Sequence, residues 1–300
     1  MSERINVNGV IGPPDRASIS PLDRGFLYGD GVFESLRTVG GGPFRLDRHL
    51  QRLQRSAQGI GLDLPLPLSG LAAAVGELLE ANHLKDARLR VTVTRGAGRP
   101  GEYVEARGPA TVVISAAAFA GPDPALHREG VAVAIPTRRQ IPPEAIDPQI
   151  KSISRLSSVL ARREARDRGA FEAILLDRLG ILTEGTVSNV FLVEGGRLRT
   201  PEAPSGGLPG ITREAVIEIA RAATIEVAEE PLPSGRLFAA DEAFLTNTSW
   251  EVLPVVDVDG RPIGGGVPGP VARRLLAGYR ELLGRECAAA AAAIGRGAGL

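Results

Sequence analysis

The stretch IDPQIKSISRLSSVLA, residues 146–161, holds the side chain from which the rest of the chain can be interpreted. Its Lys151 is one of only two lysines, although the chain contains 35 lysine and arginine residues. A guanidinium stays charged and cannot form an imine, so chemistry that needs an amine must keep a lysine. The other lysine, Lys85, lies in the polar stretch NHLKDAR and is interpreted as a solvated surface residue. Lys151 is therefore a candidate for a buried, activated amine, and the alternative is an ordinary structural lysine.

The segments around Lys151 alternate between strand and helix patterns. On its N-terminal side, VAVAIP predicts a strand. On its C-terminal side, residues 154–168 predict a helix that Gly169 ends, and EAILLD predicts a buried strand. Further along, LPGITREAVIEIARAA predicts a turn and a helix, and residues from about 268 to 283 predict a final helix. This alternation is typical of mixed α+β and α/β layers.

The first part of the chain mixes the same two patterns. The opening INVNGVI predicts a strand pair around an Asn-Gly turn, and ARLRVTVTRG and ATVVISAAAF predict strands. Apolar residues recur at helical spacing in 46–60, with Asp47 as a candidate cap, and again in 69–84. The Pro- and Gly-rich stretch AGPDPALHREG is the best candidate linker. We therefore expect domains at 1–120 and 131–287, a linker at 121–130 and a disordered tail at 288–300.

Composition excludes several classes of protein. The formal net charge is +0 and the pI about 6.9, which implies no charge-driven nucleic-acid or membrane partner. Cys287 is the only cysteine, so an intrachain disulfide and a zinc site of several thiolates are excluded. The histidines, His49, His83 and His127, are scattered and suggest no metal site. The polar N-terminus resembles no signal peptide and no apolar run is long enough to span a bilayer, so a soluble cytoplasmic protein is expected.

The turn LPGITRE is the clearest candidate for an anion site. Gly210 permits close approach of the backbone, and Ile211 and Thr212 supply N–H groups at the first turn of a helix. Unpaired donors and the helix dipole point the same way at such a helix start, which favours a phosphate. The alternative is a plain helix start with Glu214 in the first turn.

Two further turns carry polar groups. Glu184 ends a strand in LTEGTVSNVF, where a carboxylate could keep a pyridine nitrogen protonated, or could simply be a surface turn. Asn247, Thr248 and Ser249 form a hydroxyl-rich turn in TNTSWE, which could bind an anion or only terminate a strand. An amine, an acid partner and two hydroxyl-bearing anion turns together match what pyridoxal phosphate requires.

At these residues the chain resembles the class IV aminotransferases, which are the fold-type IV pyridoxal-phosphate enzymes. The motifs that carry the resemblance follow in family order from about residue 5 to 285. They are DRGFLYGDGVFESLR, HLQRLQRSA, VTRG, IKSISRLSSVLA, EAILLD, LTEGTVSNVFLV, LPGITR and EVLPV. The resemblance implies a two-domain fold like that of D-amino-acid aminotransferase, with a small N-terminal α+β domain, a larger C-terminal cofactor-binding domain and the cofactor between them. It also implies a homodimer.

The resemblance assigns roles residue by residue. Lys151 looks like the Schiff-base lysine that also moves the substrate proton, and Glu184 looks like the partner of the pyridine nitrogen. Leu208 resembles the residue packed on the ring. The remaining implied cofactor ligands are Arg52, Gly210, Ile211, Thr212 and Thr248. The implied substrate-pocket residues are Tyr28, Phe33, Arg37, Arg88, Arg90, Arg99 and Ser249.

The resemblance leaves the substrate open. Leu156 stands where branched-chain enzymes usually have tyrosine, and it resembles the D-amino-acid enzymes and the lyase of the family. The pocket arginines favour substrates that carry carboxylates. The expected activity is transfer of an amino group between a branched-chain L- or D-amino acid and a keto acid such as 2-oxoglutarate or pyruvate. The alternative is aminodeoxychorismate lyase, which eliminates pyruvate and yields 4-aminobenzoate.

Overall fold

The computed structural model describes residues 4–99, 101, 108–203 and 206–295. The chain forms two compact units. The first unit contains Met1–Ala120, Ile150–Ser154 and Leu283–Leu300, and the second contains Gly121–Gln149 and Arg155–Leu282. Lys151 therefore folds with the first unit, although the residues that flank this short segment on both sides fold with the second.

A six-stranded sheet forms the first unit, with the strand order β2-β1-β6-β5-β3-β4. The predicted N-terminal hairpin is confirmed, because β1 and β2 pair antiparallel around Asn8 and Gly9, which both have positive φ. The long neighbours β3, β5 and β6 pair antiparallel over most of their lengths. The bounds are β1 Ile5–Val7, β2 Val10–Gly12, β3 Gly31–Val39, β4 Gly42–Pro43, β5 Ala87–Thr94 and β6 Thr111–Ala118.

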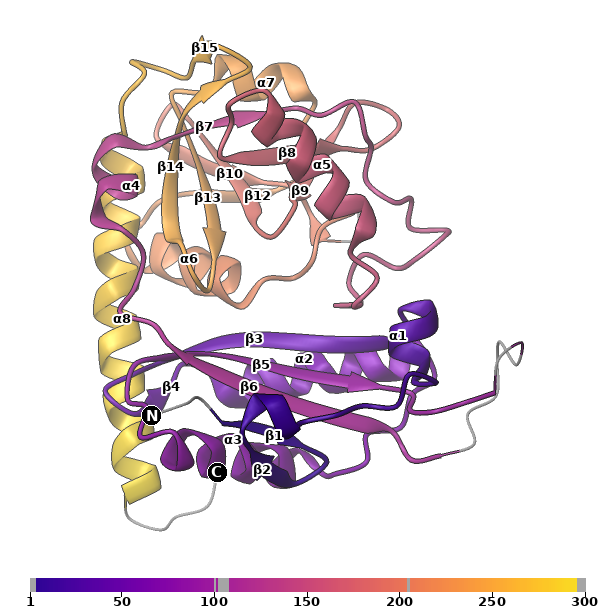
Figure 1. Cartoon of the computed structure of the whole chain (residues 1–300). Coiled ribbons are helices and arrows are strands. Elements are labelled where there is room, and N and C mark those ends of the chain that lie inside the picture. Colours follow the sequence, from indigo (N-terminus) through magenta and orange to yellow (C-terminus); the bar gives the residue numbers. More distant parts are fainter. Residues whose placement is uncertain (1–3, 100, 102–107, 204–205, 296–300) are drawn as a thin grey trace. The chain divides into compact units, whose positions relative to one another are not determined.

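Two amphipathic helices, α2 (Leu46–Gly59) and α3 (Leu68–Ala81), cover one face of this sheet (Figure 1). Side chains alternate across a strand, so Val32 and Leu36 of β3 face these helices and are fully buried. The predicted helices at 46–60 and 69–84 are thus confirmed. The predicted cap is wrong: Arg45 is the N-cap of α2, with φ 47°, and Asp47 lies inside the first turn.

Two short helical segments precede β3 in the first unit. The 3₁₀ helix η1 spans Pro14–Arg16, and the helix α1 spans Arg24–Tyr28. Asp23 caps α1, because its carboxylate accepts a hydrogen bond from the N–H of Gly25 at 2.7 Å. Thr94 and Thr111 donate their hydroxyls to the other oxygen of Asp23, at 2.8 and 2.7 Å, so α1 is fixed to the ends of β5 and β6.

The second unit is built on a nine-stranded mixed sheet with the order β12-β11-β10-β13-β14-β7-β8-β9, and β15 pairs with β14. Strand β7 pairs parallel with β8 and β14, whereas β10, β13 and β14 pair antiparallel. The bounds are β7 Val131–Ala134, β8 Glu172–Leu176, β9 Leu182–Gly185, β10 Asn189–Glu194, β11 Arg197–Thr200, β12 Val227–Glu229, β13 Glu242–Asn247, β14 Glu251–Val258 and β15 Arg261–Pro262.

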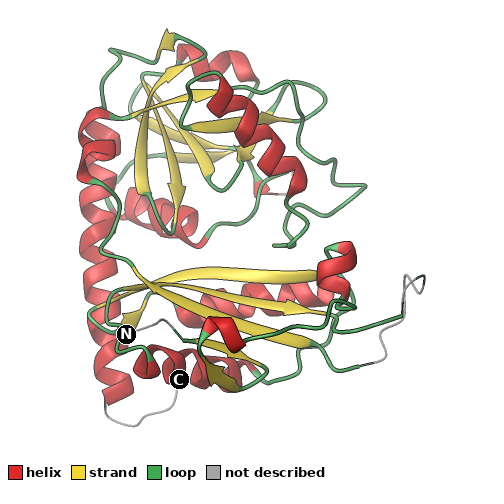
Figure 2. Ribbon diagram, viewed as in Figure 1, coloured by secondary structure: helices red, strands yellow, loops and turns green. Residues whose placement is uncertain are grey.

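Helices pack on this second sheet (Figure 2). They are α4 Pro124–Glu129, α5 Leu156–Asp167, α6 Ile211–Ala222, α7 Ser234–Ala239 and the start of α8 Pro270–Gly295. The stretch that was predicted as a linker contains α4, which Asp123 caps at 2.9 Å through the N–H of Ala125. Within the described part of the chain, no helix is both long and apolar enough to cross a membrane.

The C-terminal helix differs from its prediction. We expected it to end near residue 283 and a disordered tail to begin at 288, but α8 continues to Gly295. The expected tail begins with the alanine run after Cys287, and alanine has the highest helix propensity of all residues. An ion pair also fixes this end of the helix, because Arg45 contacts Glu286 through Nε at 3.0 Å and Nη2 at 3.1 Å. Residues 296–300 lie outside the described residues.

Close backbone contact between β4 and α8 makes a testable prediction about Gly42. A Cβ placed on Gly42 would lie 1.8 Å from the carbonyl oxygen of Cys287, and a backbone atom cannot rotate away. We expect Gly42→Ala to lower the free energy of unfolding by roughly 1–3 kcal/mol. The matched control is Gly76→Ala in α3, where a Cβ meets nothing within 4 Å. The free energy of unfolding of that variant, measured in urea, should rise by about 0.5–1 kcal/mol. Equal effects at the two positions would contradict the packing described.

Candidate functional site

Lys151 is held by both of its backbone groups at the edge of the first unit's sheet. The N–H of Phe33 in β3 donates to the Lys151 carbonyl at 2.9 Å, and the N–H of Ile153 donates to the Gly31 carbonyl at 3.0 Å. The Lys151 N–H donates to the hydroxyl oxygen of Ser56 on α2 at 3.0 Å. The short segment around Lys151 therefore lies alongside β3, and the start of its side chain has a fixed position.

The amine of Lys151 lies near an aromatic ring and an arginine. Its Nζ is 4.8 Å from the centre of the Phe33 ring, and the guanidinium carbon of Arg90 is 3.7 Å from the same ring. The negative face of an aromatic ring attracts cations, so Phe33 stabilises both groups near it. The structure thus brings together three of the residues that the sequence analysis selected.

Two more arginines lie on neighbouring strands of this sheet. Arg37 of β3 and Arg88 of β5 are direct register partners, two positions along from Ser35 and Arg90. Their guanidinium carbons lie 5.1 and 5.8 Å from the centre of the Phe119 ring. Like charges opposite each other on neighbouring strands are destabilising, and a carboxylate is the ligand that would relieve this repulsion.

The opposite face of β3 carries a buried ionic cluster. Arg52 donates from Nε and Nη2 to the two carboxylate oxygens of Glu34 at 2.6 and 2.8 Å, and Nδ1 of His49 lies 2.7 Å from Glu34. All three side chains are buried. Burial opposes ionisation of Glu34, but the charges and hydrogen bonds of Arg52 and His49 outweigh it and hold the pKa of that carboxyl well below its usual range. Burial lowers the pKa of His49.

This cluster changes the interpretation of Arg52 from the sequence. The resemblance implied that Arg52 is a cofactor ligand, and its place on the helix left open whether the side chain is solvated. The structure places Arg52 in a buried, two-point ion pair with Glu34, so it is not solvated. Its role toward a phosphate stays a prediction.

In the second unit, Glu184 is the last residue but one of β9, and two neutral groups donate hydrogen bonds to its side chain. Nε2 of Gln140 donates to Oε1 at 3.0 Å, and the N–H of Leu208 donates to Oε2 at 2.8 Å. Nε2 of Gln140 also donates to the Gly206 carbonyl at 2.7 Å. Glu184 is only 7% exposed. The structure therefore brings the predicted residues Glu184 and Leu208 into direct contact.

The start of α6 is shaped by Asn189 of β10. Its Nδ2 donates to the Leu208 carbonyl at 2.7 Å, and a Cβ on Gly210 would lie 2.1 Å from its Oδ1. Gly210 is the N-cap and has no side chain with which to cap the helix. The first turn holds the buried Ile211 and Thr212. The backbone N–H groups of a first turn have no carbonyl acceptor within the helix. This start can therefore bind an anion.

The turn after β13 is organised by Asn247. Its Oδ1 accepts hydrogen bonds from the N–H groups of Ser249 at 2.9 Å and Trp250 at 2.6 Å. The predicted ligands Thr248 and Ser249 are half-buried on this turn. Among the described residues, the hydroxyls of Ser188 and Thr246, both buried, have no hydrogen-bond partner. Buried hydroxyls of this kind fit a site that a polar ligand fills.

Two predicted substrate residues lie at the margin of the first unit. Tyr28 ends α1, and its ring lies 5.2 Å from the guanidinium carbon of Arg24. Arg99 is exposed and adjoins residue 100 and residues 102–107, which lie outside the described residues. Their roles in substrate binding stay predictions.

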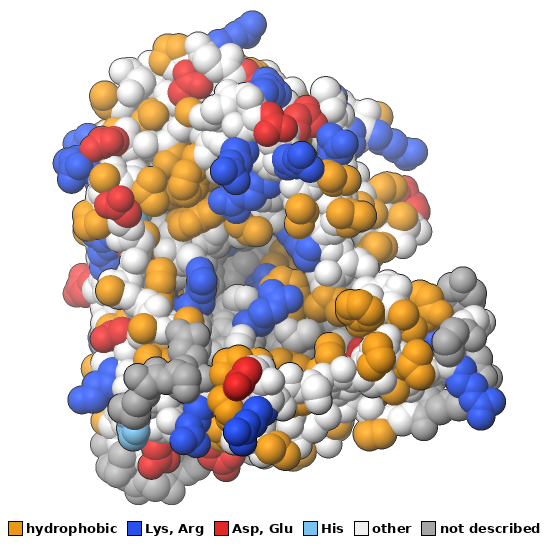
Figure 3. All heavy atoms as spheres, viewed as in Figure 1, with side chains coloured by type: hydrophobic (Ala, Val, Ile, Leu, Met, Phe, Trp, Pro, Cys, Tyr) orange, Lys and Arg blue, Asp and Glu red, His pale blue; other side chains and the backbone are white. Residues whose placement is uncertain are grey.

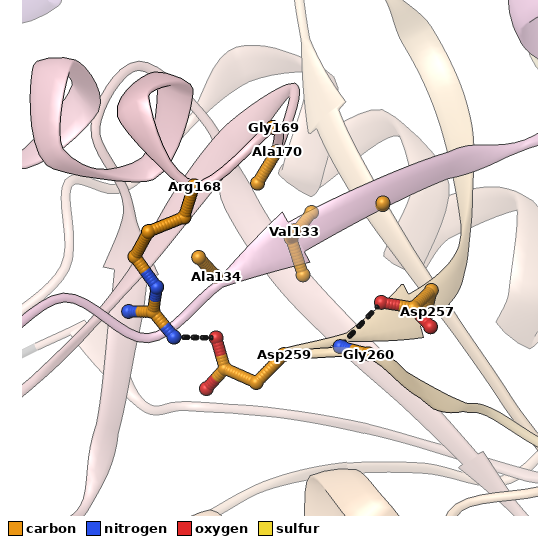
Figure 4. A pocket seen from close by; sticks show the side chains of 9 residues that line it. Val133, Ala134, Arg168, Gly169, Ala170, Asp257, Asp259 and Gly260 are labelled. Atoms are coloured by element: carbon orange, nitrogen blue, oxygen red, sulfur yellow. Dashed lines mark hydrogen bonds and ion pairs between the residues drawn. The ribbon is translucent and has the colours of Figure 1, made fainter.

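A pocket of about 320 Å³ in the second unit has no comparable chemistry. Figure 4 shows that its charged side chains are already engaged, because Arg168 pairs with Asp259 and the N–H of Gly260 donates to Asp257. None of the predicted site residues lines it. Within the described ranges, no group of three or more histidine, cysteine or acidic side chains could hold a metal ion. Figure 3 shows cationic and anionic side chains interspersed on the face in view, as their counts suggest.

Sequence reasoning missed the residues that hold the others in place. Glu34 lies on the same face of its strand as the apolar Val32 and Leu36, because side chains two residues apart point the same way. The strand pattern could therefore have indicated a carboxylate on the buried face. Gln140 and Asn189 gave no signal, because they meet their partners only through folding: Gln140 is 44 residues before Glu184.

Comparison with known proteins relates the chain to one family. The family described as Amino-transferase class IV matches residues 31–258. The chain is 38% identical over 279 residues to a putative branched-chain-amino-acid aminotransferase of Methanocaldococcus jannaschii, and the match covers 93% of this chain and 96% of that protein. It is 33% identical over 273 residues to the D-alanine aminotransferase of Bacillus licheniformis, with 91% and 94% covered.

A solved structure agrees with these relatives. The T.th. branched-chain amino acid aminotransferase with pyridoxamine 5'-phosphate superposes with a TM-score of 0.91 at 33% identity. The match covers 95% of each chain. The predicted fold class, a mixed two-domain fold of the fold-type IV enzymes, is therefore confirmed.

The buried cluster around Glu34 generates a stability prediction. Glu34→Gln removes the charge that offsets the buried Arg52, so we expect the free energy of unfolding to fall by roughly 3–5 kcal/mol near neutral pH. The pKa of Glu34 is depressed, so this contribution is present above its ordinary pKa of 4.5 and is lost as the pH falls further toward the folded value. Urea unfolding at several pH values measures both effects.

The matched control for this prediction is Glu129→Gln. Glu129 forms an exposed ion pair with Arg128 at 2.7 Å, and such pairs contribute about 0–1 kcal/mol. If Glu34→Gln were as mild as this control, or if its effect did not shrink in acid, the cluster would not stabilise the fold as described.

Proposed function

We propose that this chain, which belongs to the class IV aminotransferases, moves the amino group of a branched-chain amino acid to a 2-keto acid such as 2-oxoglutarate or pyruvate. It is a transaminase whose cofactor is pyridoxal 5'-phosphate. The observation that carries the proposal is the position of Lys151, anchored through both backbone groups with its amine near Phe33 and Arg90. The cofactor ring, when bound, accepts the electrons left behind as the substrate loses its α-proton.

Lys151 has two roles in this proposal. Lys151 would hold the cofactor through a covalent bond from its amine, and the incoming amino donor would free that amine. The freed amine then removes the α-proton from the substrate and returns it at the next stage. The fixed backbone supports this role, because an anchored Cα leaves the amine fewer conformations and so lowers the entropic cost of reaching the α-proton.

Glu184 and Leu208 would hold the ring. Glu184 would accept a hydrogen bond from the ring nitrogen, and its negative charge would stabilise a proton there. Leu208 would pack against the ring. The support for this assignment is the shared geometry, since the Leu208 N–H donates to Glu184 and positions the two residues together.

The phosphate would be held at the start of α6. The N–H groups of Ile211 and Thr212 and the Thr212 hydroxyl would donate to it, and the resemblance adds Thr248 and Arg52 as further ligands. Gly210 lets the phosphate approach the backbone, and Asn189 fixes the turn. The buried hydroxyls of Ser188 and Thr246 support a polar occupant in this unit.

The substrate carboxylates would bind to arginines. Arg37, Arg88 and Arg90 lie on neighbouring strands of the first sheet, and an arginine fork matches a carboxylate at two points. A keto acid with two carboxylates would use two of these forks. The same proposal assigns Tyr28, Phe33, Arg99 and Ser249 to the substrate pocket.

We also propose a cytoplasmic homodimer. Around α1, the first unit exposes apolar side chains, including Phe26 at 72% and Leu22 at 41%. Exposed apolar clusters of this kind commonly mark an interface. A second copy of the chain is the occupant that we propose, and sedimentation of the purified protein measures it.

The first prediction from the proposed function concerns the covalent bond at Lys151. Borohydride reduction of the loaded protein followed by peptide mapping should find the cofactor adduct on Lys151. Lys151→Ala should lose the yellow colour and at least 10³-fold of the transamination rate, on the order of the effect of removing a covalent catalyst. Lys85→Ala, the matched control, should keep both. An adduct on another residue, or a coloured and active Lys151→Ala, contradicts the proposal.

The second prediction separates the substrates. L-Leucine, D-alanine and (R)-1-phenylethylamine are each mixed with the loaded protein, and the loss of the cofactor's visible band is followed. We expect L-leucine to discharge the band, because the M. jannaschii relative and the T.th. structure carry branched-chain names.

Other outcomes of this experiment identify the alternatives. Discharge by D-alanine alone would favour a D-amino-acid enzyme, with which Leu156 and the B. licheniformis relative agree. Release of pyruvate from aminodeoxychorismate without a keto acid would identify the lyase instead.

A further inference from the structure

We propose that Gln140 is a positioning residue that aims the Glu184 carboxylate at the ring nitrogen and ties it to the segment that leads into α6. This inference rests on the proposed function, because it takes Glu184 as the partner of the ring nitrogen. Gln140 lies before Lys151 in a segment without regular structure, and neither the motifs nor the resemblance selected it.

The contacts of Gln140 place it at a junction. Its backbone N–H donates to the Leu176 carbonyl at the end of β8 at 2.9 Å, which fixes the base of the side chain. Its Nε2 then donates to two acceptors, Oε1 of Glu184 at 3.0 Å and the Gly206 carbonyl at 2.7 Å. An amide nitrogen has two protons, so this one group satisfies both acceptors at once.

The carboxylate of Glu184 is thereby fixed in direction. The Leu208 N–H holds Oε2 at 2.8 Å and Gln140 holds Oε1, so the two oxygens have donors from different segments of the chain. A carboxylate oxygen can accept more than one hydrogen bond, so these two donors do not prevent a bond from the ring nitrogen. Without Gln140, Oε1 would lose this donor, and the carboxylate would rotate more easily away from the direction the ring requires.

The other acceptor of Gln140 depends on a glycine. Gly206 has φ +123°, a conformation that side chains rarely adopt, and a Cβ there would lie 3.0 Å from Cγ2 of Thr183. The Gly206 carbonyl therefore reaches Gln140 from a turn that glycine makes accessible. Leu208 follows two residues later, so Gln140 connects Glu184 to the turn before α6.

The neutrality of Gln140 is part of its role. A guanidinium at this position would form a charge-assisted pair with Glu184 and would lower the affinity of that carboxylate for a proton-bearing ring nitrogen. An amide supplies the same direction with no net charge. Gln140 thus orients Glu184 without adding a positive charge beside it.

The experiment measures the ring nitrogen directly. Parent and variant apoproteins are loaded with pyridoxal phosphate that carries a heavy-nitrogen label in the ring, and the nitrogen NMR shift reports whether the ring is protonated. We expect a protonated ring in the parent and a partly deprotonated one in Gln140→Leu. The Kd for the cofactor should rise about tenfold, as expected for the loss of a hydrogen bond to a charged group.

Two further variants give the comparison its controls. Gln149→Leu, in the same segment, changes an exposed glutamine and should match the parent in both measurements. Gln140→Arg keeps donors but adds charge, and it should also deprotonate the ring. If Gln140→Leu does not fold by circular dichroism, Gln140→Ala, which also removes the donor, carries the test.

The outcomes separate this inference from the proposed function. A parental nitrogen shift and a parental Kd in the folded Gln140 variant overturn the role of Gln140, while a borohydride adduct on Lys151 still supports the function. Absence of that adduct in the parent overturns the proposed function itself.

Discussion

The addition of the Lys151 segment to the edge of β3 is the constraint on which the first unit's chemistry depends. A lysine side chain has a flexible four-carbon stem, and its amine can be placed only if its backbone is fixed. Here the N–H of Phe33 and the hydroxyl of Ser56 hold the two backbone groups of Lys151. The strand and the helix α2 must therefore pack correctly before the amine reaches its position.

The alternation of side chains along β3 separates two kinds of chemistry. Phe33 and Arg37 lie on one face, where Phe33 contacts Lys151 and Arg37 pairs in register with Arg88. Glu34 lies on the other face, where it is fully buried against Arg52 and His49. A shift of one residue in the pairing of β3 would exchange these faces, so the buried cluster also specifies the register on which the amine depends.

The elements could be predicted from the sequence where one local signal dominates. The Asn8–Gly9 turn, the amphipathic α2 and α3 and the β-branched strands all follow from patterns within a few residues. The end of α8 could not, because the alanine run is compatible with either disorder or helix, and the Arg45–Glu286 ion pair decides it only in the folded chain. The contacts of Gln140 and Asn189 could not be predicted for the same reason, since they join segments far apart in the sequence.

Three buried carboxylates show how the surroundings decide what a side chain can do. Glu34 has a guanidinium at 2.6 Å, so its charge is already neutralised and it serves the fold. Burial raises the pKa of Glu172, and Arg162 at 3.4 Å, the Thr186 hydroxyl and backbone N–H groups oppose this only in part. Glu184 accepts from an amide and a backbone N–H, two donors without charge. Neutral donors of this kind fix the direction of a carboxylate without adding a positive charge beside it, which suits the role toward the ring nitrogen that we propose for Glu184.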